Sequence, residues 1–338
     1  MKILVTGGTG FIGSHTVVEL ANAGFTPIIM DNLENSELSV LDGIESILGY
    51  KPPFYQEDCN DKKGFERIFQ KEESIAGIIH FAANKAVGES VANPLKYYKN
   101  NIGSLVALLE ASSKAGIPNL VFSSSCTVYG QPKNLPVAED APIQAAESPY
   151  GNTKQICEEI LRDSFLSGME IKALSLRYFN PIGAHPTAKI GELPRGVPGN
   201  LVPFVVQTAA GWIDQLSIFG SDYNTLDGTC VRDYIHVVDI AKAHVNAVQY
   251  LINNPAKKFY DWINLGTGKG STVLEVVQSF EKVSGQKLNY KIVARRPGDI
   301  EKVYASTEKA EKILGWKTIQ TLEEGLADSW RWQLTLKR

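Results

Sequence analysis

Apolar and polar positions alternate with two different periods along the first half of the chain. Short apolar runs predict β-strands at residues 3–6, 27–30, 77–81, 120–123 and 172–179. The stretches between them place apolar residues at helical spacing and predict helices at 13–23, 38–48, 62–71 and 100–115. This repeated order predicts an α/β fold: a doubly wound parallel sheet of the Rossmann type, with ligands at the carboxyl ends of its strands.

The second half of the chain has a different composition. Residues 181–199 are rich in Pro, Gly and polar side chains, which predicts a surface excursion and a domain boundary. Beyond it, helices are predicted at 201–211 and 233–251. We therefore predict a dinucleotide-binding domain at 1–180 and a smaller C-terminal α/β substrate domain at 181–338. A segment near 233–265 is expected to pack back on the first domain.

Composition and charge limit the kinds of partner. The 338 residues are 43% hydrophobic and 21% charged, and the formal net charge is −3. These values are ordinary for a globular protein and provide no polybasic attraction to nucleic acid or anionic lipid, so we predict neither partner. No apolar stretch has the length of a membrane span. The first residues run straight into a glycine turn, which predicts no secretory leader.

Cysteine and histidine spacing predicts neither a metal site nor disulfides. The five histidines are scattered without the spacing of ligands, so no metal is expected. The cysteines form no C-x-x-C pair, which is typical of reduced residues in a cytoplasmic protein. They are Cys59, Cys126, Cys157 and Cys230.

A glycine-rich turn follows the first predicted strand. Gly7, Gly10 and Gly13 connect that strand to an amphipathic helix, so backbone N–H groups can face a pyrophosphate with no Cβ in the way. Asp31 ends the next strand, where a carboxylate accepts hydrogen bonds from the adenosine ribose and repels a 2′-phosphate. With no Arg beside it, Asp31 favours NAD over NADP. Two alternatives stay open: a turn that only allows close packing, and an Asp31-Asn32 pair that only caps a turn.

Tyr150 and Lys154 are the leading candidates for acid–base chemistry. Pro149 predicts the first turn of a helix on which these two side chains, four residues apart, share one face. The reference pKa of a phenol is about 10, so a phenolate at pH 7 requires a shift of about three units. A neighbouring ammonium and a positive nicotinamide ring supply charge of the right sign. Tyr129 and Lys133 have the same spacing, but a glycine and a proline between them argue against a helix, so we predict no function for that pair.

A run of three serines ends the strand predicted at 120–123. A hydroxyl at that end of the sheet can hydrogen-bond both a substrate oxygen and Tyr150, which favours Ser125 as the third catalytic group. We interpret Ser123 and Ser124 as strand-end residues that bond to backbone. A hydrolase nucleophile is not indicated, because the chain has no G-x-S-x-G motif and no evident serine–histidine pairing.

These residues together resemble the short-chain dehydrogenase/reductase superfamily, particularly its extended branch. The turn has the spacing G-x-x-G-x-x-G, and Phe81-Ala82-Ala83 resembles the family's turn along the cofactor. The resemblance implies that Ser125, Tyr150 and Lys154 are catalytic, with Asp58 contacting adenine and Asn100 as a helix-start asparagine. It implies an NAD-binding set: Gly7, Gly10, Phe11, Ile12, Gly13, Asp31, Asn32, Asn35, Ser36, Asp58, Cys59, Phe81, Ala82, Ala83, Lys85, Asn100, Ser123, Tyr150, Lys154, Tyr178 and Phe179.

Four longer segments resemble the UDP-glucose 4-epimerase family within that branch. They are residues 85–90, 177–186, 228–236 and 295–299. A dehydratase of the same branch would carry Asp-Glu beside its catalytic hydroxyl residue, where this chain has Cys126 and Thr127. The resemblance implies a substrate-binding set: Lys85, Ser125, Tyr150, Asn180, Asn200, Leu201, Phe219, Arg232, Arg296, Asp299 and Val303.

The activity implied by this resemblance is reversible C4 epimerisation of UDP-glucose and UDP-galactose through a transient 4-keto sugar, with tightly bound NAD. Tyr150 would remove the proton of the 4-hydroxyl, Ser125 would assist, and Lys154 would hold the phenolate and the nicotinamide ribose. A homodimer is expected, as is common in this family. The alternatives are another UDP-sugar enzyme, either a dehydratase or a different epimerase, and a non-catalytic NAD-binding sensor.

Two arginines suit the diphosphate of such a substrate. The resemblance assigns Arg232 and Arg296 to that role, and the chemistry agrees, because a guanidinium can bind phosphate oxygens through paired, charge-assisted hydrogen bonds. The alternatives are that Arg232 pairs with Asp233 or another carboxylate, and that Arg296 is a solvated charge.

The sugar pocket is expected to be open on one side. Counting without gaps from the motif at 296–299, Val303 occupies the position where some members of the family carry a bulky tyrosine. The smaller side chain predicts room for an N-acetyl group, and hence UDP-GlcNAc and UDP-GalNAc as additional substrates. Tyr304 follows directly, so a shift of one residue would reverse this prediction.

Overall fold

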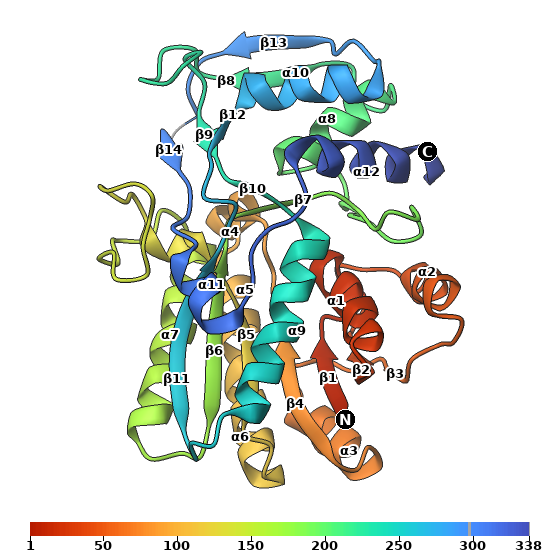
Figure 1. The fold of residues 1–338 in the computed structure, drawn as a ribbon, viewed down its shortest axis with the longest axis vertical. Helices are drawn as coiled ribbons and strands as arrows, with labels where there is room; N and C mark the ends of the chain where they lie inside the picture. The colour runs from red at the N-terminus through yellow and green to blue at the C-terminus, as the bar shows by residue number, and fades with distance from the viewer. Residues whose placement is uncertain (297–298, 338) are drawn as a thin grey trace.

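The computed structural model describes residues 1–296 and 299–337, and its main layer is a seven-stranded parallel sheet (Figure 1). Pro297 and Gly298, quoted above within one motif, lie outside the described residues. In spatial order the strands are β11 (Phe259–Leu265), β6 (Lys172–Tyr178), β5 (Asn119–Ser125), β4 (Ile75–His80), β1 (Lys2–Thr6), β2 (Thr26–Met30) and β3 (Phe54–Tyr55). The chain builds outward from β1 in both directions, so the strand order reverses between β1 and β4, where such sheets bind ligands.

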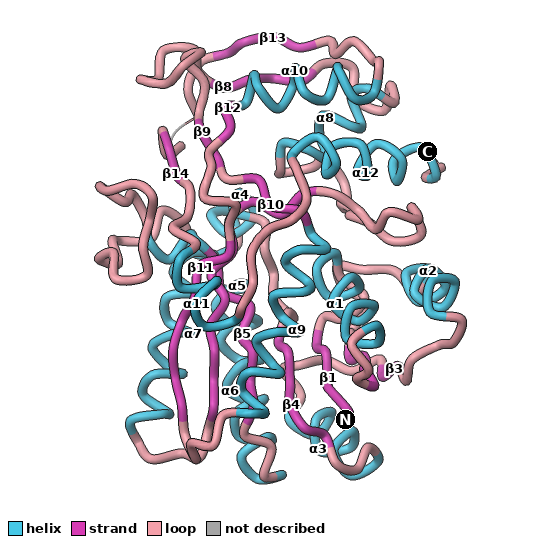
Figure 2. The backbone as a smooth tube through the Cα atoms, in the orientation of Figure 1, coloured by secondary structure: helices cyan, strands magenta, loops and turns pink. Residues whose placement is uncertain are grey.

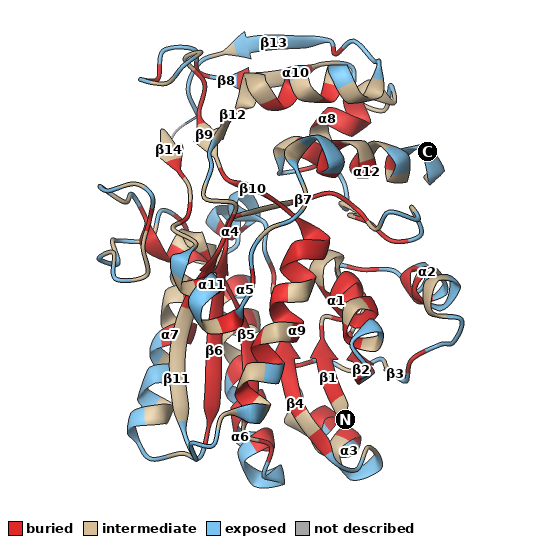
Figure 3. Cartoon of the chain, viewed as in Figure 1, coloured by how far each residue is buried: buried red, intermediate tan, exposed pale blue. Residues whose placement is uncertain are grey.

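Helices cover both faces of this sheet. One core contains residues of α1 (Phe11–Asn22), α2 (Ser39–Leu48), α9 (Val237–Asn253) and α11 (Glu308–Leu314). The other contains residues of α3 (Lys62–Lys71), α6 (Gly103–Ala115) and α7 (Pro149–Leu166). Successive residues of β1 serve opposite cores: Ile3 and Val5 the first, Leu4 the second. Figure 3 shows the buried strands between the two helical layers, and the predicted doubly wound α/β fold is confirmed.

A smaller group of elements lies beyond the carboxyl ends of the main strands (Figures 1 and 2). Its strand groups are β7 (Asn180–Ile182) with β10 (Tyr234–His236), β12 (Ser271–Thr272) with β9 (Val231–Arg232) and β14 (Lys302–Val303), and β8 (Leu216–Phe219) with β13 (Tyr290–Val293). Its helices are α8 (Leu201–Ala209), α10 (Val273–Ser284) and α12 (Leu322–Thr335). Val206, Phe280 and Leu326 are buried together in its core.

Short helical segments follow β4 and β5. They are α4 (Val87–Ala92), α5 (Pro94–Tyr97), a π-helix (Tyr98–Ile102) and a 3-10 helix (Cys126–Tyr129). Among the described residues, no helix combines the length and apolar character needed to cross a membrane. The four cysteines are free thiols.

Two expectations for the second half of the chain are corrected. The helix predicted at 233–251 begins at residue 237, because residues 234–236 pair with β7 instead. The segment 181–199 is not simply a surface excursion, since Ile182, Ala184 and Ile190 are buried. The strand β11 was not predicted, because it is defined by pairing with β6 across a long stretch of sequence.

Candidate functional site

The glycine turn between β1 and α1 leaves no room for a side chain at Gly7 or Gly13. Gly7 has a φ of +68°, and a Cβ added there would lie 2.8 Å from the backbone nitrogen of Ala82. A Cβ on Gly13 would lie 2.1 Å from the carbonyl oxygen of Gly7. Gly10 is the N-cap of α1 and caps it with no side-chain hydrogen bond, so backbone N–H groups and the helix dipole are available to an anion. These features fit the pyrophosphate of a dinucleotide.

Replacing Gly13 with alanine is expected to abolish stable retention of the dinucleotide. The added methyl would force apart the first turn of α1 and the strand-end turn at Gly7. The measurement is the amount of NAD released by denaturing the purified protein, with the unfolding temperature as a check on folding. Gly199→Ala tests the same change at a glycine where an added Cβ would have no neighbour within 4 Å. If Gly13→Ala retains wild-type NAD content, this assignment of the turn is wrong.

Asp31 lies at the end of β2, beside the glycine turn. Its side chain is buried, and one carboxylate oxygen accepts a hydrogen bond from the backbone N–H of Thr9 at 3.1 Å. The other oxygen accepts from Leu33 N–H at 2.9 Å and from the Ser36 hydroxyl at 3.0 Å. Asp31 therefore does cap a turn, as the alternative interpretation proposed. The same bonds fix the carboxylate next to the turn, where it has lone pairs left for a ribose.

Hydrogen bonds between side chains hold three predicted cofactor residues, Asn35, Asp58 and Asn100, to neighbouring segments. Asn35 donates to the side-chain oxygen of Asn84 at 2.9 Å, which links the segments after β2 and β4. Asn60 donates to Asp58 at 3.0 Å and to Asn100 at 2.9 Å. The expectation that Asn100 starts a helix is corrected, since it lies within a π-helix that continues into α6.

The remaining predicted cofactor residues lie around this framework. Lys85 forms an ion pair with Glu192 at 3.0 Å and lies over the ring of Phe11 at 5.8 Å. Cys59 is buried, which raises the pKa of its thiol, and its sulfur lies 3.9 Å from that of Met30. Five of the others follow strand ends: Asn32, Phe81, Ala82, Ala83 and Phe179. Ser123 and Tyr178 lie within β5 and β6, and Ile12 lies in the first turn of α1.

The predicted catalytic helix is α7. Pro149 occupies its first turn, and the N-cap Ser148 accepts a hydrogen bond from Gly151 N–H at 3.1 Å. The Lys154 ammonium lies 6.0 Å from the centre of the Tyr150 ring, so the two side chains share one face as predicted.

The second Tyr-x-x-x-Lys sequence does not form such a pair. Tyr129 is buried in the 3-10 helix, where its hydroxyl donates to Asn264 at 2.6 Å. Lys133 is exposed in the following loop. The prediction that these residues do not converge is confirmed.

The protein environment alone does not produce a phenolate at Tyr150. Burial raises the pKa of Tyr150 to about 12, while a hydrogen bond with Ser125 acts in the opposite direction. Burial also lowers the pKa of Lys154 to about 8, against the raising influence of Cys157 and Glu158. The Lys154 ammonium donates to the carbonyl oxygen of Ser123 at 2.6 Å. A positive nicotinamide ring would supply the further charge that favours a phenolate.

Ser125 lies at the carboxyl end of β5, within reach of Tyr150. Its hydroxyl oxygen accepts a hydrogen bond from Thr127 N–H at 3.2 Å. The interpretation that Ser123 and Ser124 bond to backbone is wrong, because both hydroxyls reach side chains. Ser123 hydrogen-bonds the Tyr178 hydroxyl, and Ser124 donates to Glu158 at 2.5 Å.

A buried ion pair between Glu158 and Arg177 lies beneath the catalytic residues. Arg177 donates to Glu158 through two nitrogens, one of them at 2.9 Å, and to the Tyr129 hydroxyl at 2.9 Å. The pair joins α7, which carries Lys154, to β6. Ser124 also donates to Glu158, which joins α7 to β5, the strand that ends at Ser125. This ion pair was not predicted from the sequence, although Glu158 follows Lys154 by one helical turn and Arg177 begins the segment 177–186.

Strand pairing brings the predicted substrate residues together from distant parts of the chain. Asn180 pairs with Tyr234, and Arg232 pairs with Val303. The Arg232 side chain lies 3.5 Å from Asp299, and Arg296 donates to the same carboxylate at 3.0 Å. Arg232 therefore pairs with a carboxylate, as one alternative proposed, but with Asp299 and not with its neighbour Asp233.

Three more residues of the predicted substrate-binding set, Phe219, Asn200 and Leu201, lie on β8 and at the start of α8. The guanidinium of Arg296 lies 5.4 Å from the centre of the half-exposed Phe219 ring. Asn200 is the N-cap residue of α8, and Leu201 begins that helix.

Val303, the last residue of β14, and Tyr304, the residue after it, face opposite sides of the chain. Val303 is buried in a cluster with Phe179, and Cys126 packs against that cluster beside Ser125. Tyr304 instead lies beside Gly270, where an added Cβ would be 3.2 Å from its ring.

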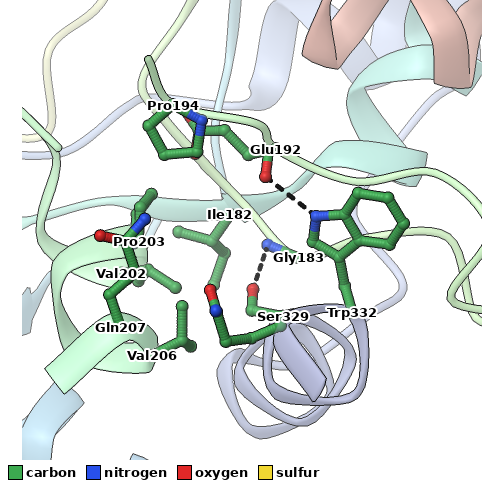
Figure 4. Close-up of a pocket in the computed structure, with 11 residues that line it drawn as sticks. Ile182, Gly183, Glu192, Pro194, Val202, Pro203, Val206, Gln207, Ser329 and Trp332 are labelled. Atoms are coloured by element: carbon green, nitrogen blue, oxygen red, sulfur yellow. Dashed lines mark hydrogen bonds between the residues drawn. The ribbon is translucent and has the colours of Figure 1, made fainter. Parts of the chain in front are cut away.

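A small pocket lies between β7, α8 and α12 (Figure 4), and its lining includes Glu192, the ion-pair partner of Lys85. Trp332 donates to the carbonyl oxygen of Glu192 at 2.9 Å, and Gly183 N–H donates to Ser329 at 3.1 Å. None of the residues lining it belongs to the predicted site. We interpret it as a packing feature that holds α12 to the segment after β7.

Comparison with known proteins agrees with this arrangement. The family model described as GDP-mannose 4,6 dehydratase matches residues 4–329. The UDP-glucose 4-epimerase of Bacillus subtilis (strain 168) is 51% identical over 333 residues, covering 98% of this chain and 97% of that protein. The chain belongs to the UDP-glucose 4-epimerase family. The expectation of an NAD-dependent isomerase is thereby confirmed at the level of the family.

Solved structures in this family contain the expected ligands. UDP-glucose 4-epimerase from Stenotrophomonas maltophila, with bound NAD and formylated UDP-arabinopyranose, has a TM-score of 0.96 and 46% identity, covering 99% of this chain and 98% of that chain. The enzyme from Bifidobacterium longum, in complex with NAD⁺ and UDP, has a TM-score of 0.94 and 45% identity, with coverage of 99% and 98%. NAD as cofactor and C4 epimerisation of a UDP-hexose as reaction agree with these relatives.

Proposed function

We propose that this chain interconverts UDP-glucose and UDP-galactose with Tyr150, Ser125 and Lys154 as its catalytic residues. The observation that carries the proposal is that the three side chains meet at the carboxyl end of β5. Tyr150 hydrogen-bonds Ser125, and the Lys154 ammonium lies near the Tyr150 ring and donates to the Ser123 carbonyl oxygen. Bound NAD would supply hydride transfer, accepting the hydride from C4 and returning it to the opposite face of the sugar.

The protein's own residues manage the proton and hold the substrate. Tyr150 takes the proton from the 4-hydroxyl and gives it back after the sugar has turned over, while Ser125 hydrogen-bonds the same oxygen. Lys154 favours the phenolate electrostatically and anchors the nicotinamide ribose. Arg232 and Arg296 bind the diphosphate, and Phe219 stacks on the uracil. Firm binding of UDP leaves the hexose free to rotate.

The test is conversion of UDP-galactose to UDP-glucose by the purified protein without added NAD. We expect steady conversion and no net release of NADH. Accumulation of NADH with a stable keto product, or no conversion of any UDP-hexose, would contradict the proposal.

We also propose that UDP-GlcNAc and UDP-GalNAc are substrates. Support comes from Val303, which faces the cluster beside Cys126 and Ser125, with no bulky ring at that position. Val303→Tyr is expected to lower kcat/KM for UDP-GlcNAc by about tenfold or more, relative to that for UDP-glucose, because steric exclusion is worth a few kcal/mol. Val303→Cys, a small replacement, should leave the ratio unchanged. Equal losses for both substrates in Val303→Tyr would contradict the open-pocket proposal.

The organisation of the protein is proposed on similar grounds. We assign dinucleotide binding to residues 1–180 and UDP-sugar binding to residues 181–338, with a segment near 233–265 packing back on the first domain. The apolar side chains of Val87, Val91 and Leu95 are exposed at four-residue spacing on α4 and α5, which supports a homodimer through this surface. Light scattering on the purified protein would measure its mass in solution and so test whether it is a dimer.

Four free cysteines support a reducing, cytoplasmic location.

A further inference from the structure

Asp233 is a buried carboxylate that has no cation partner among the residues the structure describes. It lies between Arg232 and β10, and its side chain is 0% exposed. One carboxylate oxygen accepts hydrogen bonds from Thr267 N–H at 2.9 Å and from the Thr267 hydroxyl at 2.7 Å. The other accepts from Gly268 N–H at 3.3 Å and from Ala305 N–H at 3.1 Å. Four donors therefore converge on one side chain.

Both side-chain oxygens of Asp233 must act as acceptors, because backbone N–H groups point at each of them. Burial raises the pKa of the Asp233 carboxyl, and the surrounding donors act in the opposite direction. An asparagine would place its own N–H₂ group against backbone N–H groups and leave buried donors without partners. The chain closes tightly around the carboxylate, since a Cβ added to Gly266 would lie 2.4 Å from its oxygen.

The segments joined by Asp233 are those that carry the proposed substrate contacts. Arg232 precedes Asp233 directly. The backbone carbonyl oxygen of Asp233 accepts a hydrogen bond from Asn180 N–H at 2.9 Å. Ala305, which its side chain holds, follows Val303 by two residues. Asp233 therefore contacts, through side chain or backbone, the strands that present the diphosphate ligands and the wall of the sugar pocket.

We propose that Asp233 is a positioning residue for the UDP-sugar. It fixes the spacing between β7, β9 and the segment after β14, so that Arg232, Asn180 and Val303 meet one substrate, and it does not itself contact that substrate. The inference rests on the proposed binding of a UDP-sugar by these residues.

The test uses Asp233→Asn in the NAD-loaded protein. We expect the dissociation constant for UDP and the KM for UDP-galactose to rise by about tenfold or more, since buried donors lose a charged acceptor. NAD content should match the wild type, and kcat per NAD-loaded subunit should change less than KM. A purely structural role would lower the active fraction and leave both UDP affinity and KM unchanged.

Asp239→Asn is the matched control. Asp239 is also buried, and it accepts hydrogen bonds from Ile319 and Gln320 N–H at 2.9 Å each, but it lies on α9 and holds none of the proposed substrate segments. Both bonds reach one carboxylate oxygen, so an asparagine can keep them through its carbonyl oxygen, and the variant removes only a buried charge in the first turn of α9. We therefore expect Asp239→Asn to leave UDP affinity unchanged. If both variants weaken UDP binding equally, the proposal is wrong.

Milder variants test the proposal even if Asp233→Asn does not fold. Thr267→Val removes the hydroxyl that donates to Asp233 and accepts from Lys269 N–H at 3.1 Å. It should weaken UDP binding by about threefold or more, whereas Thr267→Ser should restore it. UDP affinity within twofold of wild type in Thr267→Val and in any folded Asp233→Asn would overturn the positioning role. Failure of the wild-type protein to bind UDP would instead refute the proposed function.

Discussion

Replacing Tyr150 with phenylalanine is expected to lower kcat for UDP-galactose by about 10²–10⁴-fold, the usual contribution of a positioned acid–base group. The hydroxyl is the only part removed, so the ring still fills its place on α7 beside Ser125 and Lys154. The NAD content and the affinity for UDP should therefore stay at wild-type values. The measurements are UDP-glucose formation in a coupled assay and the nucleotide released on denaturation.

This result would distinguish a base from a packing residue. A Tyr150→Phe protein with normal NAD content and more than a tenth of the wild-type kcat would show that another group moves the proton. Loss of NAD together with activity would show that Tyr150 acts mainly in cofactor binding.

Replacing Lys154 with methionine is expected to shift the acidic limb of the pH profile to higher pH and to lower kcat at pH 7 by about 10²-fold or more. Without cofactor, burial holds the pKa of Tyr150 at about 12. The Lys154 ammonium lies 6.0 Å from that ring, and its loss removes positive charge that stabilises the phenolate. The phenol pKa then rises, so a given rate is reached only at higher pH. The measurement is kcat/KM against pH at saturating NAD.

Lys133→Met is the control, because Lys133 follows Tyr129 at the same spacing but is exposed and outside the site. It should leave the profile unchanged. A Lys154→Met protein whose kcat falls with no displacement of the acidic limb would show that Lys154 anchors the cofactor without affecting the phenol pKa.

The parts of this account that sequence could predict depend on local patterns. The glycine turn, the strand at β1 and the Tyr150–Lys154 spacing each lie within a few residues, so backbone geometry and side-chain period specify them directly. The helix at α3 was predicted with its observed bounds, residues 62–71, because its apolar residues repeat at helical spacing. In the structure, Asp61 caps its start.

The parts that sequence missed depend on contacts between distant segments. β11 becomes a strand by pairing with β6, and residues 234–236 become β10 by pairing with β7, which overrides the helical pattern that follows them. The Glu158–Arg177 pair joins α7 to β6, and the four bonds to Asp233 come from residues 34 to 72 positions away. Nothing in a local window specifies which donors will surround a buried carboxylate.

The central claim is that the hydride leaves C4 and returns to it within one active site. The most direct test is conversion of UDP-galactose carrying deuterium at C4, mixed with UDP-galactose labelled with ¹³C and carrying no deuterium. The account predicts UDP-glucose in which the deuterium stays at C4 and never appears in the ¹³C-labelled product. Deuterium lost to solvent, or found on the ¹³C-labelled sugar, would contradict it.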